Sequence, residues 1–356
     1  MRFARGSAIG RFVSRLTDKL LRRSMVPLDF AGRPNAHAAW ELARDRALIN
    51  WNLKNLGAQM AQRCAAERAG AAAAAPLTLP LQSKPTRQAD VDSGWFAYWC
   101  AELKIPVVYH RKTWEYCYLL QTLHDAGMLQ AGRRGLGFAC GREPIASYLA
   151  GKGVSVLATD LLPDQRKRTR WEESGQHAGG IEQIRHPHLV AKEDFDRQVQ
   201  FRFVDMNDIP ATLSGFDFCW SICALEHLGS IANGLRFIEN SLAVVRGGGI
   251  AVHTTEYNLD NDGPTADNCA TVLFQRRHFE AIADKLQSQG HLVAPLCFEA
   301  GTGPMDNFVD LPPYDWHPLY GRHHPLPPEP SPAHLKLSIG GFACTCFGIT
   351  IRKRPG

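Results

Sequence analysis

The chain has 356 residues, a formal net charge of +5, and 45% hydrophobic against 21% charged residues, a composition typical of a soluble globular protein. No stretch reaches the roughly 18 to 20 continuous apolar residues that a membrane span needs, and the N-terminus lacks the features of a secretory signal. The ten cysteines contain no Cys-x-x-Cys pair, which argues against a zinc ribbon or a redox pair. We therefore expect a cytoplasmic protein.

The first 23 residues carry much of the excess positive charge. Apolar residues recur there at helical spacing, with Arg and Lys on the remaining surface (Ile9, Phe12, Val13, Leu16 and Leu20). One interpretation is a basic amphipathic helix in peripheral contact with the inner face of an anionic membrane. A transit peptide has a similar pattern, and a helix packed on its own protein or only partly ordered fits equally well.

Two further segments precede the main domain. Residues 36–68 are predicted to be helical, and an alanine run with three prolines follows, so residues 1–88 read as a basic helical extension and a linker. Residues 89–130 are rich in Trp and Tyr. They predict either an aromatic helical cap at the entrance of a site or a helix pair packed on the core.

From residue 131 to 356, predicted strands and helices alternate. The strands are expected at 135–140, 153–159, 200–204, 216–222, 249–254, 291–298 and 342–352, and the helices at 142–151, 161–172, 230–246 and 274–289. Such alternation predicts an α/β domain whose parallel sheet has helices on both faces.

The glycines of GLGFACGREP, residues 135–144, can be read in two registers. A dinucleotide fingerprint starting at Gly135 would need a strand before it, and the preceding HDAGMLQAGRR is polar and turn-like. In the other register, residues 135–139 form the strand, residues 139–143 form the turn, and a helix begins near Pro144. The next strand ends in Asp160, about 20 residues later, which suits an acid that binds both ribose hydroxyls.

Polar residues also follow the later strands. The third strand ends in Asp205-Met206, a pair suited to an adenine ring, and the fourth ends at Ser221-Ile222 before Glu226-His227. Glu256 follows the fifth. Ligands bind at the carboxyl ends of strands in open α/β sheets, so we expect a site at this edge.

These segments together resemble the class I S-adenosylmethionine-dependent methyltransferases. The matching segments are GFACGREP, ATDL, VDMND, FDFCWSICALEHL and VVRGGGIAVHTTE, within residues 115 to 352. The aromatic-Asp-apolar strand followed by Leu-Glu-His is similar to the small-molecule branch, and the region from SGWFAYW onward resembles methyltransferases of bacterial surface-glycan gene sets. The resemblance implies a Rossmann-like seven-stranded, mostly parallel sheet with an antiparallel last strand.

The resemblance also implies S-adenosylmethionine as cofactor. Its binding residues are then expected to be Ala139, Cys140, Gly141, Arg142, Glu143, Asp160, Leu161, Asp205, Met206, Ser221 and Ile222. The sequence departs from the family pattern in two places. The usual Gly-x-Gly-x-Gly is Ala139-x-Gly141-x-Glu143, and an acid that supports the methionine amino group is replaced by Gly137. Either Glu143 takes over this role, or backbone carbonyls near Ser221 and Ile222 do.

Methyl transfer needs alignment of the acceptor and, for a hydroxyl acceptor, removal of a proton. His227 is the candidate base because histidine titrates near neutral pH, with Glu226 and Glu256 as alternative bases or orienting partners. A structural role in ordering the loop is the alternative for His227. We expect no metal site. Glu226 and Glu256 with His253 would form one only if His253 did not alternate into the core.

The expected activity is methylation of a hydroxyl on a sugar, a glycan or another small metabolite. An N- or C-methyltransferase and a catalytically silent binding protein of the same fold are the alternatives. Nucleic acid is not an expected partner, because Ser-Ile-Cys-Ala stands where base-amino methyltransferases carry Asn/Asp-Pro-Pro-aromatic.

The Pro-rich insert at about 310–334 is either a lid over the site or a stiff surface excursion. Oligomeric state is not predicted.

Overall fold

The computed structural model describes residues 31, 33, 35–68, 75–162, 178–312, 314 and 333–356. Contacts divide the chain into two compact units, residues 1–56 and 57–356. The predicted helix at 36–68 is confirmed as α2 (Ala36–Glu67), which runs through this boundary. The predicted N-terminal basic helix lies outside the described residues, as does nearly all of the helix expected at 161–172. Within the described part, no helix combines the length and apolar character that a membrane crossing requires.

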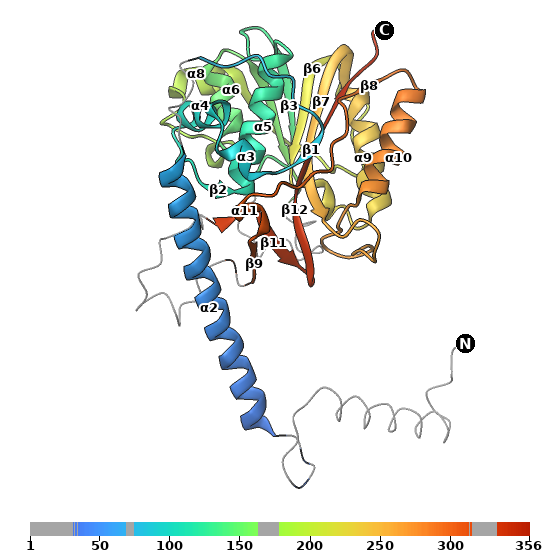
Figure 1. Cartoon of the computed structure of the whole chain (residues 1–356). Helices are drawn as coiled ribbons and strands as arrows, with labels where there is room; N and C mark the ends of the chain where they lie inside the picture. The colour runs from blue at the N-terminus through green and yellow to red at the C-terminus, as the bar shows by residue number, and fades with distance from the viewer. Residues whose placement is uncertain are drawn as a thin grey trace, which may run out of the picture. The chain divides into compact units, whose positions relative to one another are not determined.

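A mostly parallel sheet forms the centre of the larger unit (Figure 1). Its principal strands, in spatial order, are β5 (Val199–Phe203), β4 (Ser155–Asp160), β3 (Arg134–Phe138), β6 (Phe216–Ile222), β7 (Val245–Asn258) and β12 (Phe342–Arg352). The first five run parallel, and β12 is antiparallel to β7. The Rossmann-like fold with an antiparallel last strand is therefore confirmed.

The sheet continues beyond the expected strands on the β12 side. The additional short strands among the described residues are β1 (Lys84–Pro85), β8 (Leu292–Val293), β9 (Val309–Asp310) and β11 (Lys336–Ile339). The strand expected at 291–298 is thus reduced to the two residues of β8. Pro295 explains the difference, because it has no N–H to donate to the ladder.

Helices cover both faces of the sheet, as the alternation predicts (Figure 1). They are α3 (Gln88–Val91), α4 (Gly94–Leu103), α5 (Arg111–Asp125), α6 (Ile145–Gly151), α8 (Lys192–Gln198), α9 (Ile231–Val244), α10 (Arg276–Ser288) and α11 (Pro304–Asn307), with 3-10 turns at Ile181–Gln183 and Leu225–His227. On β7, His253 contacts Ser241 of α9 while the next residue, Thr254, contacts Glu115 of α5. Since successive strand residues point to opposite faces, α9 and α5 lie on opposite sides.

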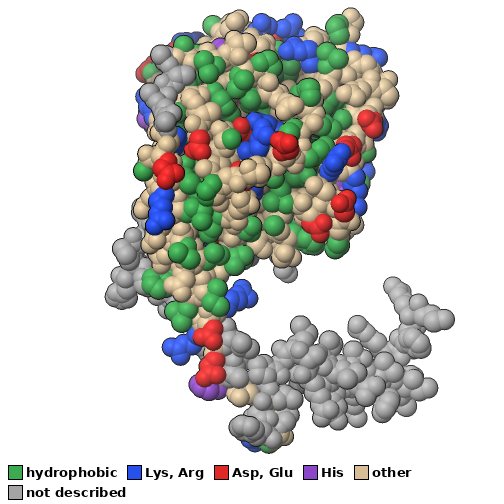
Figure 2. Space-filling model, viewed as in Figure 1, with side chains coloured by type: hydrophobic (Ala, Val, Ile, Leu, Met, Phe, Trp, Pro, Cys, Tyr) green, Lys and Arg blue, Asp and Glu red, His purple; other side chains and the backbone are tan. Residues whose placement is uncertain are grey.

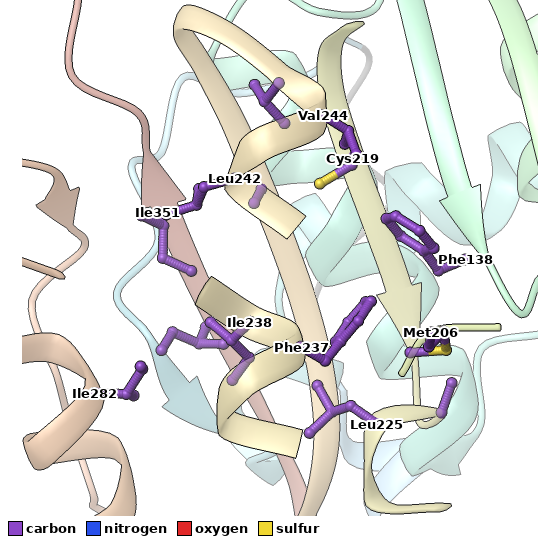
Figure 3. Close-up of a cluster of buried hydrophobic side chains, with 14 of the residues drawn as sticks. Phe138, Met206, Cys219, Leu225, Phe237, Ile238, Leu242, Val244, Ile282 and Ile351 are labelled. Atoms are coloured by element: carbon purple, nitrogen blue, oxygen red, sulfur yellow. The ribbon is translucent and has the colours of Figure 1, made fainter. Parts of the chain in front are cut away.

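Apolar side chains on the α9 face form a continuous core. Phe138 of β3 and Phe237 of α9 pack edge to face at 5.1 Å between ring centroids, and Leu225, Met206 and Ile238 pack around them (Figure 3). A helix with an apolar stripe is held mainly by such burial. This packing fixes the start of the segment that follows β6, which carries candidate catalytic residues.

The aromatic segment at 89–130 forms α3, α4 and α5. Its large side chains are buried rather than exposed at an entrance, Trp95, Trp99, Trp114 and Tyr118 among them. Trp114 donates a hydrogen bond to Asp90, and Trp99 donates one to Gln121. This burial fits the helix pair packed on the core.

The two ends of the Pro-rich insert meet. β9 precedes the insert, and β10 (Ala333–His334) follows it and pairs with β2 (Tyr109–His110). The imidazole of His334 lies 2.7 Å from a carboxylate oxygen of Asp310, so the insert leaves and rejoins the domain at one place. Apart from Tyr314 and His334, its aromatic and histidine residues lie outside the described residues, and the lid interpretation stays a prediction.

Candidate functional site

The turn after β3 has the backbone shape of a ligand-binding loop. Ala139 and Gly141 both have positive φ, +48° and +52°, and Cys140 donates its N–H to the carbonyl of Thr159 at 2.8 Å. Glycine adopts positive φ without strain and alanine does not. Ala139, which stands at the first glycine position of the Gly-x-Gly-x-Gly pattern, therefore adopts this conformation at an energetic cost. Helix α6 then begins at Ile145 with Pro144 as its N-cap residue, as predicted.

Asp160 ends β4 with a fixed carboxylate. It is 1% exposed, and its two oxygens accept hydrogen bonds from the N–H groups of Leu161 at 2.7 Å and Ala178 at 2.8 Å. Each carboxylate oxygen can accept more than one hydrogen bond. The geometry therefore holds the predicted ribose acid in one orientation.

The candidates after β5 and β6 occupy the same edge of the sheet. Asp205 is half-buried and accepts a hydrogen bond from the N–H of Asn207, while Met206 is buried against the core (Figure 3). The hydroxyl of Ser221 bonds His253 on the α9 face, and Ser221 and Ile222 pair with His253 and Thr254 of β7 in the sheet. Because β5, β4, β3 and β6 are neighbours, the structure brings all the cofactor candidates to one edge.

Steric contacts explain why position 137 holds glycine and no larger residue. A Cβ atom on Gly137 would lie 2.3 Å from the sulfur of Cys140 and 2.5 Å from the indole ring of Trp220. Both distances are far below van der Waals contact. The Trp220 ring thus occupies the space that the side chain of the family acid would need.

Next to this loop, ionisable side chains from five segments form a buried group that we call the edge cluster. It comprises Arg111, Lys112 and Glu115 of α5, Glu143 of the loop, Cys223 and Glu226 after β6, Glu256 of β7 and Cys346 of β12. Only Glu226 and Glu256 among these were sequence candidates for catalysis, and Glu143 for cofactor binding.

Two cations organise the edge cluster. The guanidinium of Arg111 lies 2.6 Å from a carboxylate oxygen of Glu256 and donates to the sulfurs of Cys346 at 3.1 Å and Cys223 at 3.3 Å. The ammonium of Lys112 lies 3.6 Å from Glu115 and 3.7 Å from Glu143. Lys112 therefore links the cluster to the turn after β3.

Several polar atoms here are buried without a hydrogen-bond partner. Among the described residues these include one carboxylate oxygen each of Glu115, Glu226 and Glu256, and the Nε atoms of Arg111 and Trp220. Buried polar groups in proteins are nearly always satisfied, and exceptions mark strain, ligands or ions. Their concentration at the carboxyl edge indicates that a polar ligand completes this site.

Burial changes the ionisation of the acids. It raises the pKa of Glu226 to about 8, with the neighbouring Glu256 adding to the effect, and it raises the pKa of Glu143 to about 8 against the influence of Lys112. For Glu115 burial acts in the same direction, but Lys112 and Arg111 outweigh it and the pKa is lowered. At neutral pH, Glu226 and Glu143 are therefore mostly protonated.

His227 lies in the turn after β6 beside Glu226. Its Nδ1 is 2.9 Å from the carbonyl of Ala270, and its Nε2 is 3.8 Å from a carboxylate oxygen of Glu226. The contact with Ala270 ties the turn to the loop at 270–271, which is the structural role considered from the sequence. The role as base stays a prediction.

His253 does not join the edge cluster. It is fully buried on the α9 face, with its ring nitrogens 2.9 Å from the hydroxyls of Ser221 and Ser241. Its alternation into the core was predicted. The metal set of Glu226, Glu256 and His253 is therefore not assembled, although ligand atoms of Cys223, Glu226 and Glu256 lie within 4.8 Å of one another.

We expect His253 to make the fold acid-sensitive. Burial lowers its pKa from 6.5 to about 3, so below pH 6.5 the unfolded state binds a proton that the folded state does not, and stability falls as the pH falls toward 3. Between pH 6.5 and 5.0 this costs about 2 kcal/mol. Denaturant unfolding at both pH values checks it, and His253→Gln should reduce the slope. An unchanged slope in the variant would contradict the assignment.

One pattern in the sequence points to cluster residues that were not among the predicted catalytic or cofactor-binding residues. Arg111, Lys112 and Glu115 stand at i, i+4 and i, i+3 spacing, which places them on one helix face, and they open a helix that the fold directs at the site. Cys223 and Cys346 are 123 residues apart in the sequence, and no local pattern could join them.

Comparison with known proteins gives structural similarities only. No family model matches the chain, and no curated protein does. A methyltransferase from Methanosarcina mazei is 13% identical, with 65% of this chain and 96% of that chain covered and a TM-score of 0.38. Magnesium protoporphyrin IX methyltransferase from Synechocystis with bound S-adenosylmethionine is 10% identical (66% and 76% covered, TM-score 0.36). The [4+2]-cyclase SpnF is 16% identical (67% and 83% covered, TM-score 0.40).

All three TM-scores are below 0.5, so the strand order decides the assignment. A mostly parallel sheet with an antiparallel last strand, here β5-β4-β3-β6-β7 followed by β12, is what the sequence resemblance implies. The chain therefore has the expected Rossmann-like fold.

Proposed function

We propose that this protein is an S-adenosylmethionine-dependent methyltransferase acting on a small molecule. The observation that carries the proposal is the group of unpartnered polar atoms buried at the carboxyl edge beside the turn after β3. This edge is where ligands bind in open α/β sheets. Three buried carboxylate oxygens there have no hydrogen-bond partner within the fold, and a polar ligand at this place would supply donors for them.

Residues at the ends of three strands suit the cofactor. The turn at residues 139–143 would hold the methionine part, Asp160 the ribose hydroxyls and Asp205 the adenine amino group, while Glu143 replaces the acid that Gly137 lacks. S-adenosylmethionine supplies an electrophilic methyl group on a positively charged sulfur. The protein needs to align the acceptor with that methyl group and to exclude water.

For the acceptor we propose a hydroxyl of a sugar or another small metabolite. The hydroxyl proton would pass to His227, whose Nε2 faces the Glu226 carboxyl group at 3.8 Å. A base near neutral pKa is efficient for such a transfer.

The surface on the face shown in Figure 2 mixes acidic, basic and apolar side chains, without a basic stripe on that face.

Calorimetric titration with S-adenosylhomocysteine, with NADH as control, tests the class. We expect micromolar binding of the first and none of the second, followed by transfer of labelled methyl groups to an acceptor in a panel of methyl glycosides and small phenols. Binding without transfer to this panel or to cell extract would favour the silent binding protein. Absence of S-adenosylhomocysteine binding would overturn the proposal.

His227→Ala is expected to reduce turnover by about 100-fold or more, the usual contribution of a general base, with less than a threefold change in cofactor affinity. The check combines turnover with the accepted substrate and calorimetric affinity for S-adenosylhomocysteine. If turnover and cofactor affinity were lost to a similar extent, the result would favour a structural role for His227, through its contact with the carbonyl of Ala270, over a role as base.

A further inference from the structure

The edge cluster contains more buried carboxyl groups than cationic side chains. Four carboxyl groups (Glu115, Glu143, Glu226 and Glu256) face two cations, Arg111 and Lys112. Glu115 and Glu226 are 0% exposed and Glu256 is 3% exposed. One oxygen of each of these three is without a hydrogen-bond partner. Buried carboxylates of this kind are stable only when a cation or donors complete them.

A metal ion fits this place poorly. The two possible ligand sets, Cys223 with Glu226 and Glu256, and Cys223 with Glu115 and Cys346, share Cys223. The guanidinium of Arg111 already contacts both sulfurs and Glu256. An ion there would have to displace a buried guanidinium. An organic cation that reaches the oxygens without a hydrogen-bond partner from the side of the turn after β3 would not have to displace the guanidinium.

The cluster is connected to the cofactor turn. Lys112 lies between Glu115 and Glu143, and Glu143 belongs to the turn after β3. Glu226 and Glu256 follow β6 and β7, the strands next to β3 in the sheet. A ligand lying on the turn is therefore next to the edge cluster, which reaches the turn through Glu143 and Lys112.

We propose that the edge cluster binds the positively charged sulfur of the methyl donor, so that the site holds the cationic donor more tightly than the neutral product. This inference rests on the proposed function. Methyl transfer removes the charge from the sulfur, since the methyl group leaves with no electrons from the C–S bond and the sulfur keeps the pair. With S-adenosylhomocysteine in place, no positive charge on the ligand faces the carboxyl groups of the cluster, which favours product release.

Binding of the donor should also release a proton. A cation beside Glu226 favours its ionised form, whereas burial keeps this carboxyl mostly protonated in the free protein. The charged and titratable groups around it are Arg111, Lys112, Glu115, Glu143, Cys223, His227, Glu256 and Cys346. Donor affinity is therefore expected to rise between pH 6.5 and 8, and product affinity to change less.

The test is calorimetric titration of the full chain with three nucleosides at pH 6.5, 7.5 and 8.5. The ligands are S-adenosylmethionine, sinefungin, in which an ammonium-bearing carbon replaces the sulfonium, and S-adenosylhomocysteine. We expect the two cationic ligands to bind on the order of tenfold more tightly than the neutral one, the effect of one charge at a few ångströms in a partly buried site. Titration in buffers of different ionisation enthalpy should show proton release for the cationic ligands.

Glu226→Gln should reduce the preference to within about threefold. Glu239→Gln is the matched control, because Glu239 of α9 pairs with Lys285 and Gln289 away from the edge, and it should keep the preference. The wild-type comparison among ligands stands even if Glu226→Gln fails to fold.

Equal affinity for all three nucleosides, or tighter binding of the neutral product, would overturn the inference while leaving the proposed function in place. Tight binding of Zn²⁺ or Mg²⁺ that Glu226→Gln abolishes would make the cluster a metal site and overturn it as well. If none of the three nucleosides binds, the proposed function itself fails.

Discussion

Replacement of Asp160 by alanine is expected to lower the affinity for S-adenosylhomocysteine by about 100-fold or more. In the proposed complex its carboxylate accepts hydrogen bonds from both ribose hydroxyls, and a hydrogen bond to a charged group contributes roughly 1.5–3 kcal/mol. Two such bonds correspond to at least about two orders of magnitude in the dissociation constant. Calorimetric titration measures the loss directly.

The same carboxylate also supports the local backbone. Asp160 accepts the N–H groups of Leu161 and Ala178, so Asp160→Asn, which keeps one carbonyl acceptor, separates ligand contacts from loop order. Asp217→Ala is the matched control, because Asp217 at the start of β6 holds the N–H of Arg134 and the guanidinium of Arg246 at the opposite edge of the sheet. Retained affinity in Asp160→Ala, or an equal loss in Asp217→Ala, would contradict the ribose assignment.

The fold could be predicted because its signals are local. The predicted strand 216–222 coincides with β6, and 342–352 coincides with β12, since each is a largely apolar segment rich in aromatic or β-branched residues. β7 is longer than its predicted 249–254 and covers Val245–Asn258. Its polar ends, Thr255 to Asn258, are buried because β12 and the loop at 272–275 cover them, which is a tertiary effect that a single-segment pattern does not contain.

The site could be predicted only in part, for a similar reason. Residues at strand ends are brought together by the rule that parallel strands share one carboxyl edge, so Asp160, Asp205 and the turn at 139–143 lie together as expected. Arg111 and Glu115 enter from α5, a helix that precedes β3 in the chain. Their relation to Glu256 and Cys346 depends on how α5 packs across β7 and β12, and this packing has no sequence signature.

Trp220 and Gly137 illustrate how a departure from a family pattern is compensated within the fold. A side chain at 137 and an indole at 220 cannot occupy the same space, since a Cβ at 137 would lie 2.5 Å from the ring of Trp220 and 2.3 Å from the sulfur of Cys140. A side chain at 137 is therefore incompatible with the indole of Trp220 in its present position, and residues 137 and 220 should be energetically coupled.

Gly137→Ala is accordingly expected to destabilise the fold by about 3 kcal/mol, the upper part of the usual range for overpacking. Denaturant unfolding measures this loss, and Gly180→Ala is the control because no atom lies within 4 Å of its added Cβ. In a Trp220→Ala background, which itself costs roughly 3–5 kcal/mol, the alanine at 137 should cost less than it does in the wild type, since the clash with the indole is removed and only that with the Cys140 sulfur remains. Additive losses in the double variant would show that Trp220 does not determine the residue at 137, and the departure from the family pattern would then need another cause.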